Sequence, residues 1–182
     1  MHFLAIWLQS TDPAEAERLF EAAASAGYAE AMVGLGGLLR KVDPERALRW
    51  YRRAADAGSP TGMYNLAGLL EAEAPDEARV WCKRAAELDF VDAMIVLGVL
   101  CAKTAPNEAQ RWYERAAGLG SGHAMYNLGV LLKDTDLRMA RRWWQQAEQS
   151  SYPTATMALR GTDSRRIRWR RNVRRGDSYW EV

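Results

Sequence analysis

The sequence is poor in the residues that build metal sites, disulfide frameworks and membrane spans. Its two cysteines, Cys82 and Cys101, and its two histidines, His2 and His123, stand at no spacing typical of metal ligands. We therefore expect no metal and no other cofactor, and we expect both cysteines to remain thiols in a reducing cytoplasm. No stretch approaches eighteen consecutive apolar residues, and the apolar run at residues 3–8 is too short and too uncharged at its start for a signal peptide. The sequence thus predicts a cytoplasmic protein without a membrane span.

Sequence motifs of catalysis are also missing. The chain has no glycine-rich phosphate loop, no nucleophile elbow and no dinucleotide fingerprint. Its carboxylates, such as Glu45, Asp76 and Glu108, fall in the first turns of predicted helices, where they complement the helix dipole. We therefore predict that the protein is not an enzyme.

Lysine is scarce as well, with four residues against 21 arginines in a chain of 182 residues and net charge +2. The arginines are unevenly placed, because residues 160–182 carry a net charge of +5 whereas residues 1–159 carry −3. The chain is therefore predicted to consist of a mildly acidic body and a basic C-terminal segment.

What the sequence has in abundance is internal repetition, with a period of 31 residues and no insertion or deletion. The repeat shows as columns of equivalent positions. These hold the small residues Ala31, Gly62, Ala93, Ala124 and Ala155, the leucines Leu35, Leu66, Leu97, Leu128 and Leu159, and the tryptophans Trp50, Trp81, Trp112 and Trp143. The column after the tryptophans holds Phe20, Tyr51, Cys82, Tyr113 and Trp144.

Each repeat is predicted to be a pair of helices. Apolar residues recur at the three-and-four spacing of a helix over residues 32–39 and again over residues 47–55. Asp12 and Asp43 each precede a proline, which is typical of an N-cap followed by the first helical residue. Gly27, Gly58 and Gly120 are predicted to end second helices in the left-handed conformation, with Asp89 in the equivalent place.

The columns also predict how the helices pack. A Gly or Ala follows each core leucine, as at Gly36 and Ala67, and lets a neighbouring helix approach closely. We expect the tryptophans of the second helices, such as Trp81 and Trp112, to fill the space between repeats. One helical hairpin cannot bury its apolar face alone, so successive repeats must share a core.

These motifs resemble those of a known family. The pattern Ala-x2-Trp-x3-Ala-Ala-x2-Gly at residues 47–58 and 109–120, and Ala-Met-Tyr-Asn-Leu-Gly at residues 124–129, are similar to the signature of Sel1-like repeats, relatives of tetratricopeptide repeats. The connection between the two helices is shorter than is usual in that family. The resemblance implies an all-α, right-handed superhelical αα-hairpin solenoid of about five repeats that binds other proteins without catalysis. The units would be about 1–27, 28–58, 59–89, 90–120 and 121–151, a partial unit to residue 160, and then the segment 161–182.

A partner could bind along the first helices. If positions 32, 35, 36, 38 and 39 are buried, the opposite face carries positions 30, 33, 34, 37 and 40 and their equivalents. We predict a groove there for a protein or peptide segment, with contact residues Tyr64, Asn65, Ile95, Tyr126, Asn127 and Lys133. The alternative, in which the Tyr-Asn pairs serve packing between repeats, stays open.

The two ends of the chain suggest further partners. Arginines and a tryptophan in the basic segment could bind nucleic acid through phosphates and base stacking, could attach to an acidic membrane surface, or could simply form a solvated cap. The candidate contacts are Arg165, Arg166, Arg168, Trp169, Arg170 and Arg171. At the other end, Met1 aligns with Met32, so the chain is expected to begin inside a first helix. That end would then associate with a partner or a second copy, or the natural chain would start upstream.

Overall fold

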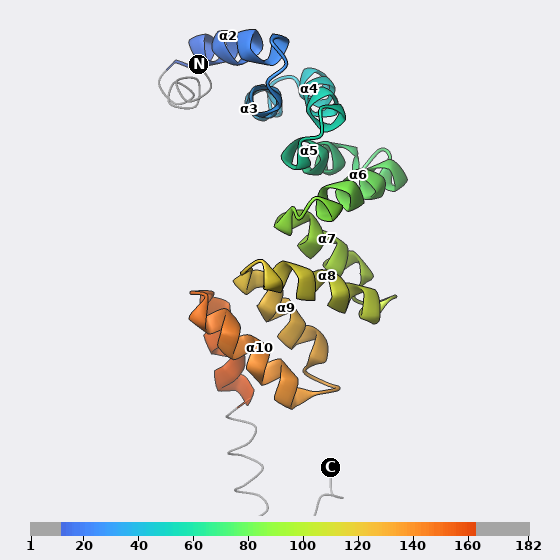
Figure 1. Ribbon diagram of the computed structural model, residues 1–182, viewed down its shortest axis with the longest axis vertical. Coiled ribbons are helices and arrows are strands. Elements are labelled where there is room, and N and C mark those ends of the chain that lie inside the picture. Colours follow the sequence, from blue (N-terminus) through green and yellow to red (C-terminus); the bar gives the residue numbers. More distant parts are fainter. Residues whose placement is uncertain (1–11, 163–182) are drawn as a thin grey trace, which may run out of the picture. The chain divides into compact units, whose positions relative to one another are not determined.

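The computed structural model describes residues 12–162, and all regular secondary structure in that range is α-helical (Figure 1). A final helical stretch covers residues 153–162. The predictions for the N-terminal end and for the contacts Arg165 to Arg171 lie outside the described residues. The preceding helices are α2 (Pro13–Ser25), α3 (Ala29–Leu39), α4 (Pro44–Asp56), α5 (Pro60–Leu70), α6 (Pro75–Glu87), α7 (Val91–Cys101), α8 (Pro106–Gly118), α9 (Gly122–Leu132) and α10 (Leu137–Gln149).

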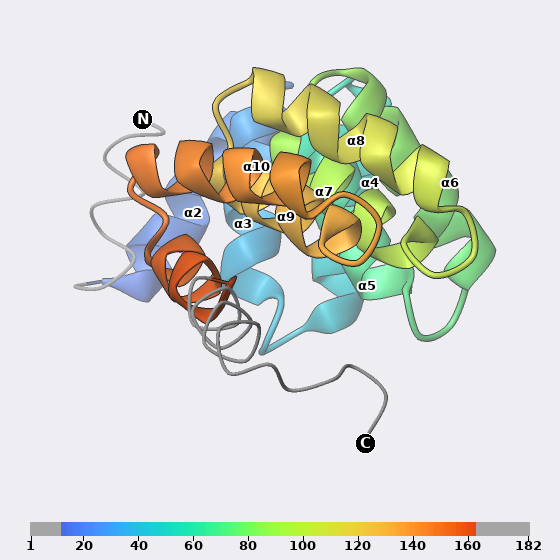
Figure 2. The same ribbon diagram turned by 90° about the horizontal axis from the view of Figure 1, so that it is seen from below.

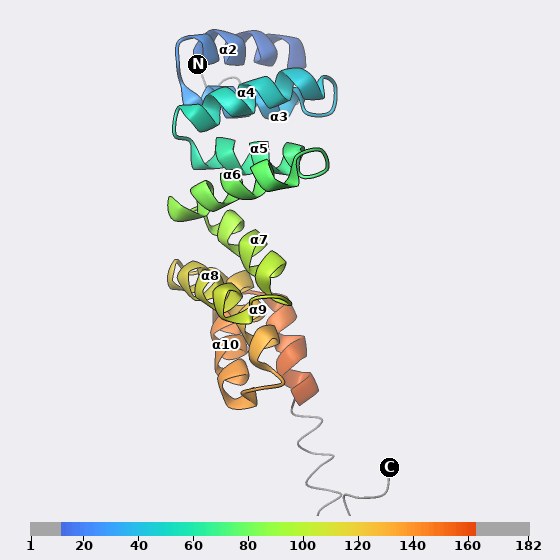
Figure 3. The same ribbon diagram turned by 90° about the vertical axis from the view of Figure 1, so that its right-hand side faces the viewer.

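The helices group into two compact units, Met1–Leu97 and Gly98–Val182. In the first unit α3 packs against α2, α4 and α5, and α5 packs against α4 and α6. Figure 3 shows α2, then α3 with α4, then α5 with α6 as successive layers of this unit. In the second unit α9 packs against both α8 and α10, and α9 and α10 lie side by side in Figure 2. Within each unit these helices therefore pack on their neighbours in sequence, as expected for a solenoid.

The second helices begin at the residues that the sequence predicts. Asp12 Oδ1 accepts a hydrogen bond from the backbone N–H of Glu15 at 3.1 Å, and Asp43 Oδ1 accepts one from Arg46 at 3.0 Å. These N-caps satisfy one of the free N–H groups at the start of α2 and α4. Asp136 caps α10 in the same way, with a hydrogen bond of 2.9 Å from Met139.

The turns that follow the second helices are left-handed. Gly27, Gly58 and Gly120 have φ angles of 93°, 86° and 88°, a conformation that glycine adopts without steric cost. Asp89 and Ser151 occupy the equivalent turns with φ angles of 62° and 58°. The predicted turn glycines are confirmed, and Ser151 is a further residue in the same conformation.

The core is built from large residues of second helices packed on small residues of first helices. Tyr51, Cys82, Tyr113 and Trp144 are all buried. A Cβ added at Gly36, Gly98 or Gly129 would overlap the ring of Tyr51, Tyr113 or Trp144, respectively. In the repeat of Ala67 and Cys82, a cysteine stands in the aromatic column and an alanine in the glycine column, so the smaller thiol accompanies a methyl group.

The tryptophan column, which we expect to fill the space between repeats, is less deeply buried than the column that follows it. Trp50, Trp81, Trp112 and Trp143 are only half-buried. Arg84 lies over the ring of Trp81 with its guanidinium carbon 4.8 Å from the ring centroid, and Trp81 Nε1 donates a hydrogen bond of 3.2 Å to Glu77 Oε1. Arg53 covers Trp50 in the same way at 4.5 Å. The tryptophans thus cover the second helices at the surface, where cation–π contacts stabilise them.

Candidate functional site

The candidate site is the face of each first helix that points away from its buried residues, which we call the inner face. On α3 it carries positions 30, 33, 34, 37 and 40, while Ala31, Met32, Leu35, Gly36 and Leu39 are buried. Gly37 and Gly68 are exposed at equivalent positions of α3 and α5. On α3 the exposed positions 30, 37 and 40 therefore lie apart from the buried residues of the helix.

In the first unit the predicted contact residues lie at different depths. Tyr64 and Asn65 are half-buried on α5, whereas Ile95 on α7 is 7% exposed and belongs to the core. The ring of Tyr64 packs against that of Phe90, which precedes α7, with centroids 5.3 Å apart. Burial raises the pKa of the Tyr64 hydroxyl, and the negative charge of Asp92 raises it further. The hydroxyl therefore stays protonated as a hydrogen-bond donor at neutral pH.

In the second unit the same tyrosine position has an aromatic partner of its own. Tyr126 on α9 packs against Tyr152 with ring centroids 5.5 Å apart, and His123 stacks on Tyr152 at 5.5 Å with an interplanar angle of 9°. Lys133 is exposed at the end of α9. The side-chain nitrogen of Asn127 is buried and has no hydrogen-bond partner among the described residues.

The aromatic contacts of the inner face recur in every second repeat, not in every repeat. Tyr64 and Phe90 stand 62 residues before Tyr126 and Tyr152, and the N-cap serines Ser59 and Ser121 are separated by the same interval. Interpretation of the sequence by single repeats missed this alternation. The signal was present, because an aromatic residue occupies the column of Phe90 and Tyr152 where the intervening repeats have serine.

Exposed apolar side chains mark the inner face of the second unit. Val99 at the end of α7 is 57% exposed, Val130 on α9 is 39% exposed, and Met157 on the last helix is 75% exposed. Val99 and Val130 occupy the position that glycine holds in α3 and α5. At this position the open face therefore changes from glycine in the first unit to an exposed valine in the second.

Cys82 and Cys101 are expected to differ in reactivity. Cys82 is buried, and its thiol donates a hydrogen bond of 3.6 Å to the carbonyl oxygen of Ala93. Burial raises the pKa of this thiol to about 11, with a smaller contribution from the charge of Glu71. Because the thiolate is the reactive form, we expect iodoacetamide at pH 8 to label Cys82 at least about ten-fold more slowly than the half-buried Cys101, as measured by mass spectrometry of digests. In a Cys101→Ser variant the remaining labelling should be slow, and rapid labelling of Cys82 would contradict the assignment.

The described residues offer no group of three or more His, Cys, Asp or Glu side chains that could hold a metal ion. Within the same residues, no helix combines the length and hydropathy that crossing a membrane requires. The site is thus a surface of aromatic, apolar and scattered charged side chains, which can bind a partner by contact and hydrogen bonding.

A model of the Sel1 repeat matches residues 1–28, 29–59, 60–90, 92–121 and 122–152. The chain belongs to the Sel1-repeat family. Its fold is accordingly an αα-hairpin solenoid of five Sel1 repeats, as the periodicity and motifs predict. No curated protein matches the chain.

Several solved structures are similar to the chain. A protective antigen of uropathogenic Escherichia coli with an SLR fold is 27% identical, with a TM-score of 0.72 over 81% of this chain. The chain spans 36% of that protein's length. A Sel1-repeat protein of Oxalobacter formigenes is 24% identical, with a TM-score of 0.78 over 87% of this chain and 74% of its own. An immunity protein of Pseudomonas aeruginosa is 24% identical, with a TM-score of 0.63 over 84% of this chain and 65% of its own.

Proposed function

We propose that the protein is a non-catalytic interaction scaffold that binds a segment of a partner protein on the inner face of its first helices. Proteins of the Sel1-repeat family are generally protein-interaction scaffolds, which supports the coarse assignment. The observation that carries the finer assignment is the exposure of Val99, Val130 and Met157 on the inner face of the second unit. Val99 and Val130 stand at equivalent positions of successive first helices, so exposed apolar side chains recur in one register of this face, as is typical of a partner surface.

The predicted contact residues fit this function in two ways. Tyr64 and Tyr126 are half-buried and held by Phe90 and Tyr152, so a partner would meet rings that are already ordered. Ordered side chains lose little conformational entropy on binding. Asn65 and Lys133 supply hydrogen-bonding groups on the same face, and Ile95 supports it from the core. The side-chain nitrogen of Asn127 is buried beneath that face.

Blocking the inner face is the test of this function. We expect Gly68→Arg in α5 and Val130→Arg in α9 each to weaken binding of a partner captured from native lysate by about ten-fold or more, because a long charged side chain would occupy the contact surface. Gly68 is suitable because a Cβ there would meet no heavy atom within 4 Å. Binding is measured with the purified partner by isothermal titration calorimetry.

A matched control separates blocking from a general effect of charge. Val80 is 52% exposed on α6, a second helix, so Val80→Arg adds the same charge away from the inner face and should leave affinity unchanged. Serine in place of Arg165, Arg166, Arg168, Arg170 and Arg171 tests the basic segment in the same assay. Full affinity in both inner-face variants, or loss of binding in the serine variant alone, would overturn the proposal.

A further inference from the structure

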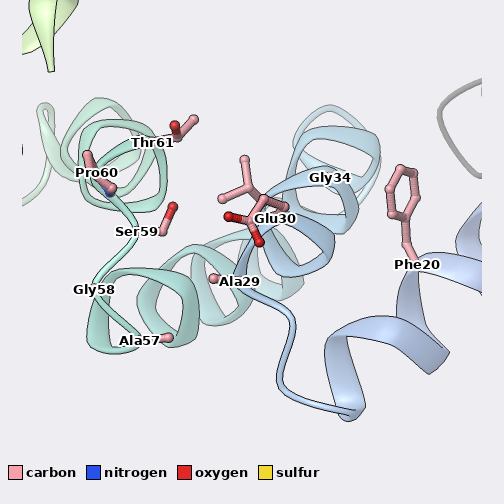
Figure 4. Close-up of a pocket in the computed structure, with 10 residues that line it drawn as sticks. Phe20, Ala29, Glu30, Gly34, Ala57, Gly58, Ser59, Pro60 and Thr61 are labelled. Carbon is pink, nitrogen blue, oxygen red and sulfur yellow. The ribbon is translucent and has the colours of Figure 1, made fainter. Parts of the chain in front are cut away.

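A cavity of about 510 Å³ opens in the first unit between α2, α3 and the turn that joins α4 to α5. Figure 4 shows Glu30 of α3 lying between Phe20 of α2 and the first turn of α5 with Ser59 and Thr61. Positions 30, 33 and 34 belong to the inner face, so the cavity is part of the proposed binding surface. The lining residues are Phe20, Ala29, Glu30, Val33, Gly34, Ala57, Gly58, Ser59, Pro60 and Thr61.

The cavity exists because two small residues stand where two other repeats have an aromatic pair. Val33 and Ser59 are equivalent to Tyr64 and Phe90, whose rings are in contact one repeat further along the first unit. In the second unit Tyr126 and Tyr152 make the same contact. The volume at Val33 and Ser59 is therefore what a large side chain fills elsewhere in this protein.

The walls of the cavity suit a side chain with an apolar stem and a positive end. Ala29, Val33, Ala57 and Pro60 present carbon surface, and Glu30 is the only charged residue of the lining. Glu30 forms no ion pair with any residue between 12 and 162. The methylene groups of lysine or arginine pack well on apolar surface while the cationic end meets a carboxylate.

We propose that this cavity receives a lysine or arginine side chain from the partner segment, with Glu30 binding its cationic end. The assignment rests on the proposed function, because it takes the inner face as the binding surface. Glu30 lies in the first turn of α3, where it also complements the helix dipole. That role stabilises the helix but does not discriminate between ligands, so the two roles can be separated by experiment.

The test is a titration of the full chain, labelled with ¹⁵N, with blocked peptides Ala-Ala-X-Ala-Ala in which X is arginine, lysine, citrulline, norleucine or glutamate. Citrulline has the shape of arginine without its charge. We expect the arginine and lysine peptides to shift the amide resonances of Gly34, Gly58 and Thr61. The citrulline peptide should bind with an affinity up to about five-fold lower than that of the arginine peptide. Raising the salt concentration should weaken binding of the charged peptides only.

Three variants complete the experiment. Glu30→Gln should remove the preference for arginine over citrulline, whereas Glu45→Gln, a matched change in the first turn of α4 and away from the inner face, should retain it. Val33→Tyr copies the filled arrangement of Tyr64 and should abolish the shifts at Gly34 and Gly58. Equal affinity for arginine and citrulline, tighter binding of norleucine or glutamate, or an unchanged preference in Glu30→Gln would each overturn the proposal. The peptides could instead shift the amide resonances of other inner-face residues without these preferences. In that case the proposed function stands, and only the assignment of the cavity to a lysine or arginine side chain is wrong.

Discussion

Replacement of Trp144 by alanine is expected to lower the free energy of unfolding by about 3–5 kcal/mol. Trp144 is 3% exposed, and its ring packs on the backbone of Gly129 in α9. Its Nε1 donates a hydrogen bond of 3.1 Å to the carbonyl oxygen of Tyr126. The variant therefore loses the packing between α9 and α10 together with this hydrogen bond.

The neighbouring Trp143 provides a matched control. It has the same side chain on the same helix but is half-buried, so Trp143→Ala should cost less than half as much as Trp144→Ala. Trp144→Phe keeps most of the apolar surface and should lose about 1 kcal/mol from the missing hydrogen bond. Guanidinium unfolding followed by circular dichroism gives the free energies, and hydrogen exchange of α9 and α10 amides locates the loss. An equal or larger effect of Trp143→Ala would show that the core has been assigned to the wrong column.

The second large effect is expected where a first helix meets an aromatic ring. A Cβ at Gly36 would lie 2.5 Å from Cε1 of Tyr51, so Gly36→Ala should destabilise the protein by about 1–3 kcal/mol through overpacking. Tyr51→Cys should be destabilising as well, because it leaves a cavity at a residue that is 2% exposed. The double variant recreates the pair of Ala67 and Cys82, and we expect it to cost at least about 1 kcal/mol less than the sum of the single changes.

Gly68 is the control for this pair of changes. It is also a helical glycine, but an added Cβ would meet no heavy atom within 4 Å. Gly68→Ala should be neutral or stabilise the protein by up to about 1 kcal/mol, since alanine favours a helix more than glycine does. Urea unfolding measures the change in stability of each variant. If the effects of the two single changes simply add in the double variant, the side-chain sizes at positions 36 and 51 are not coupled.

The parts of the fold that follow from short-range chemistry could be predicted from the sequence. The N-caps at Asp12 and Asp43 and the left-handed turns at Gly27 and Gly58 depend on neighbouring residues alone, and the structure has them as predicted. The division of each repeat into two helices follows in the same way from a constant period. Local signals that agree with one another in every repeat leave little choice of fold.

The depth of the aromatic columns could not be predicted so directly. Trp50 and Tyr51 are adjacent on one helix, and both fit an apolar stripe, so periodicity does not show which of them points to the core. A preference for burying the larger and less polar ring favours Trp50, but the structure buries Tyr51 against Gly36. The decisive constraint is the space left by a glycine on another helix. The apolar pattern of one helix carries no information about that space.

The candidate site, too, can be predicted only in part from the sequence. The open face of the first helices follows from helical geometry, whereas the cavity at Glu30 depends on the sizes of residues on three helices and a turn. Comparison of Val33 with Tyr64, and of Ser59 with Phe90, would have indicated unfilled volume in the sequence. The shape of a cavity depends on all the residues that line it, so no single sequence motif predicts it.

The 62-residue spacing of the aromatic contacts and capped turns has a consequence for engineering. An extra single repeat would bring a valine or isoleucine opposite an aromatic residue, or a tyrosine opposite a capping serine. Duplication of two consecutive repeats would reproduce every junction that the chain already contains. The unit by which this array can be lengthened or shortened without redesign is therefore a pair of consecutive repeats.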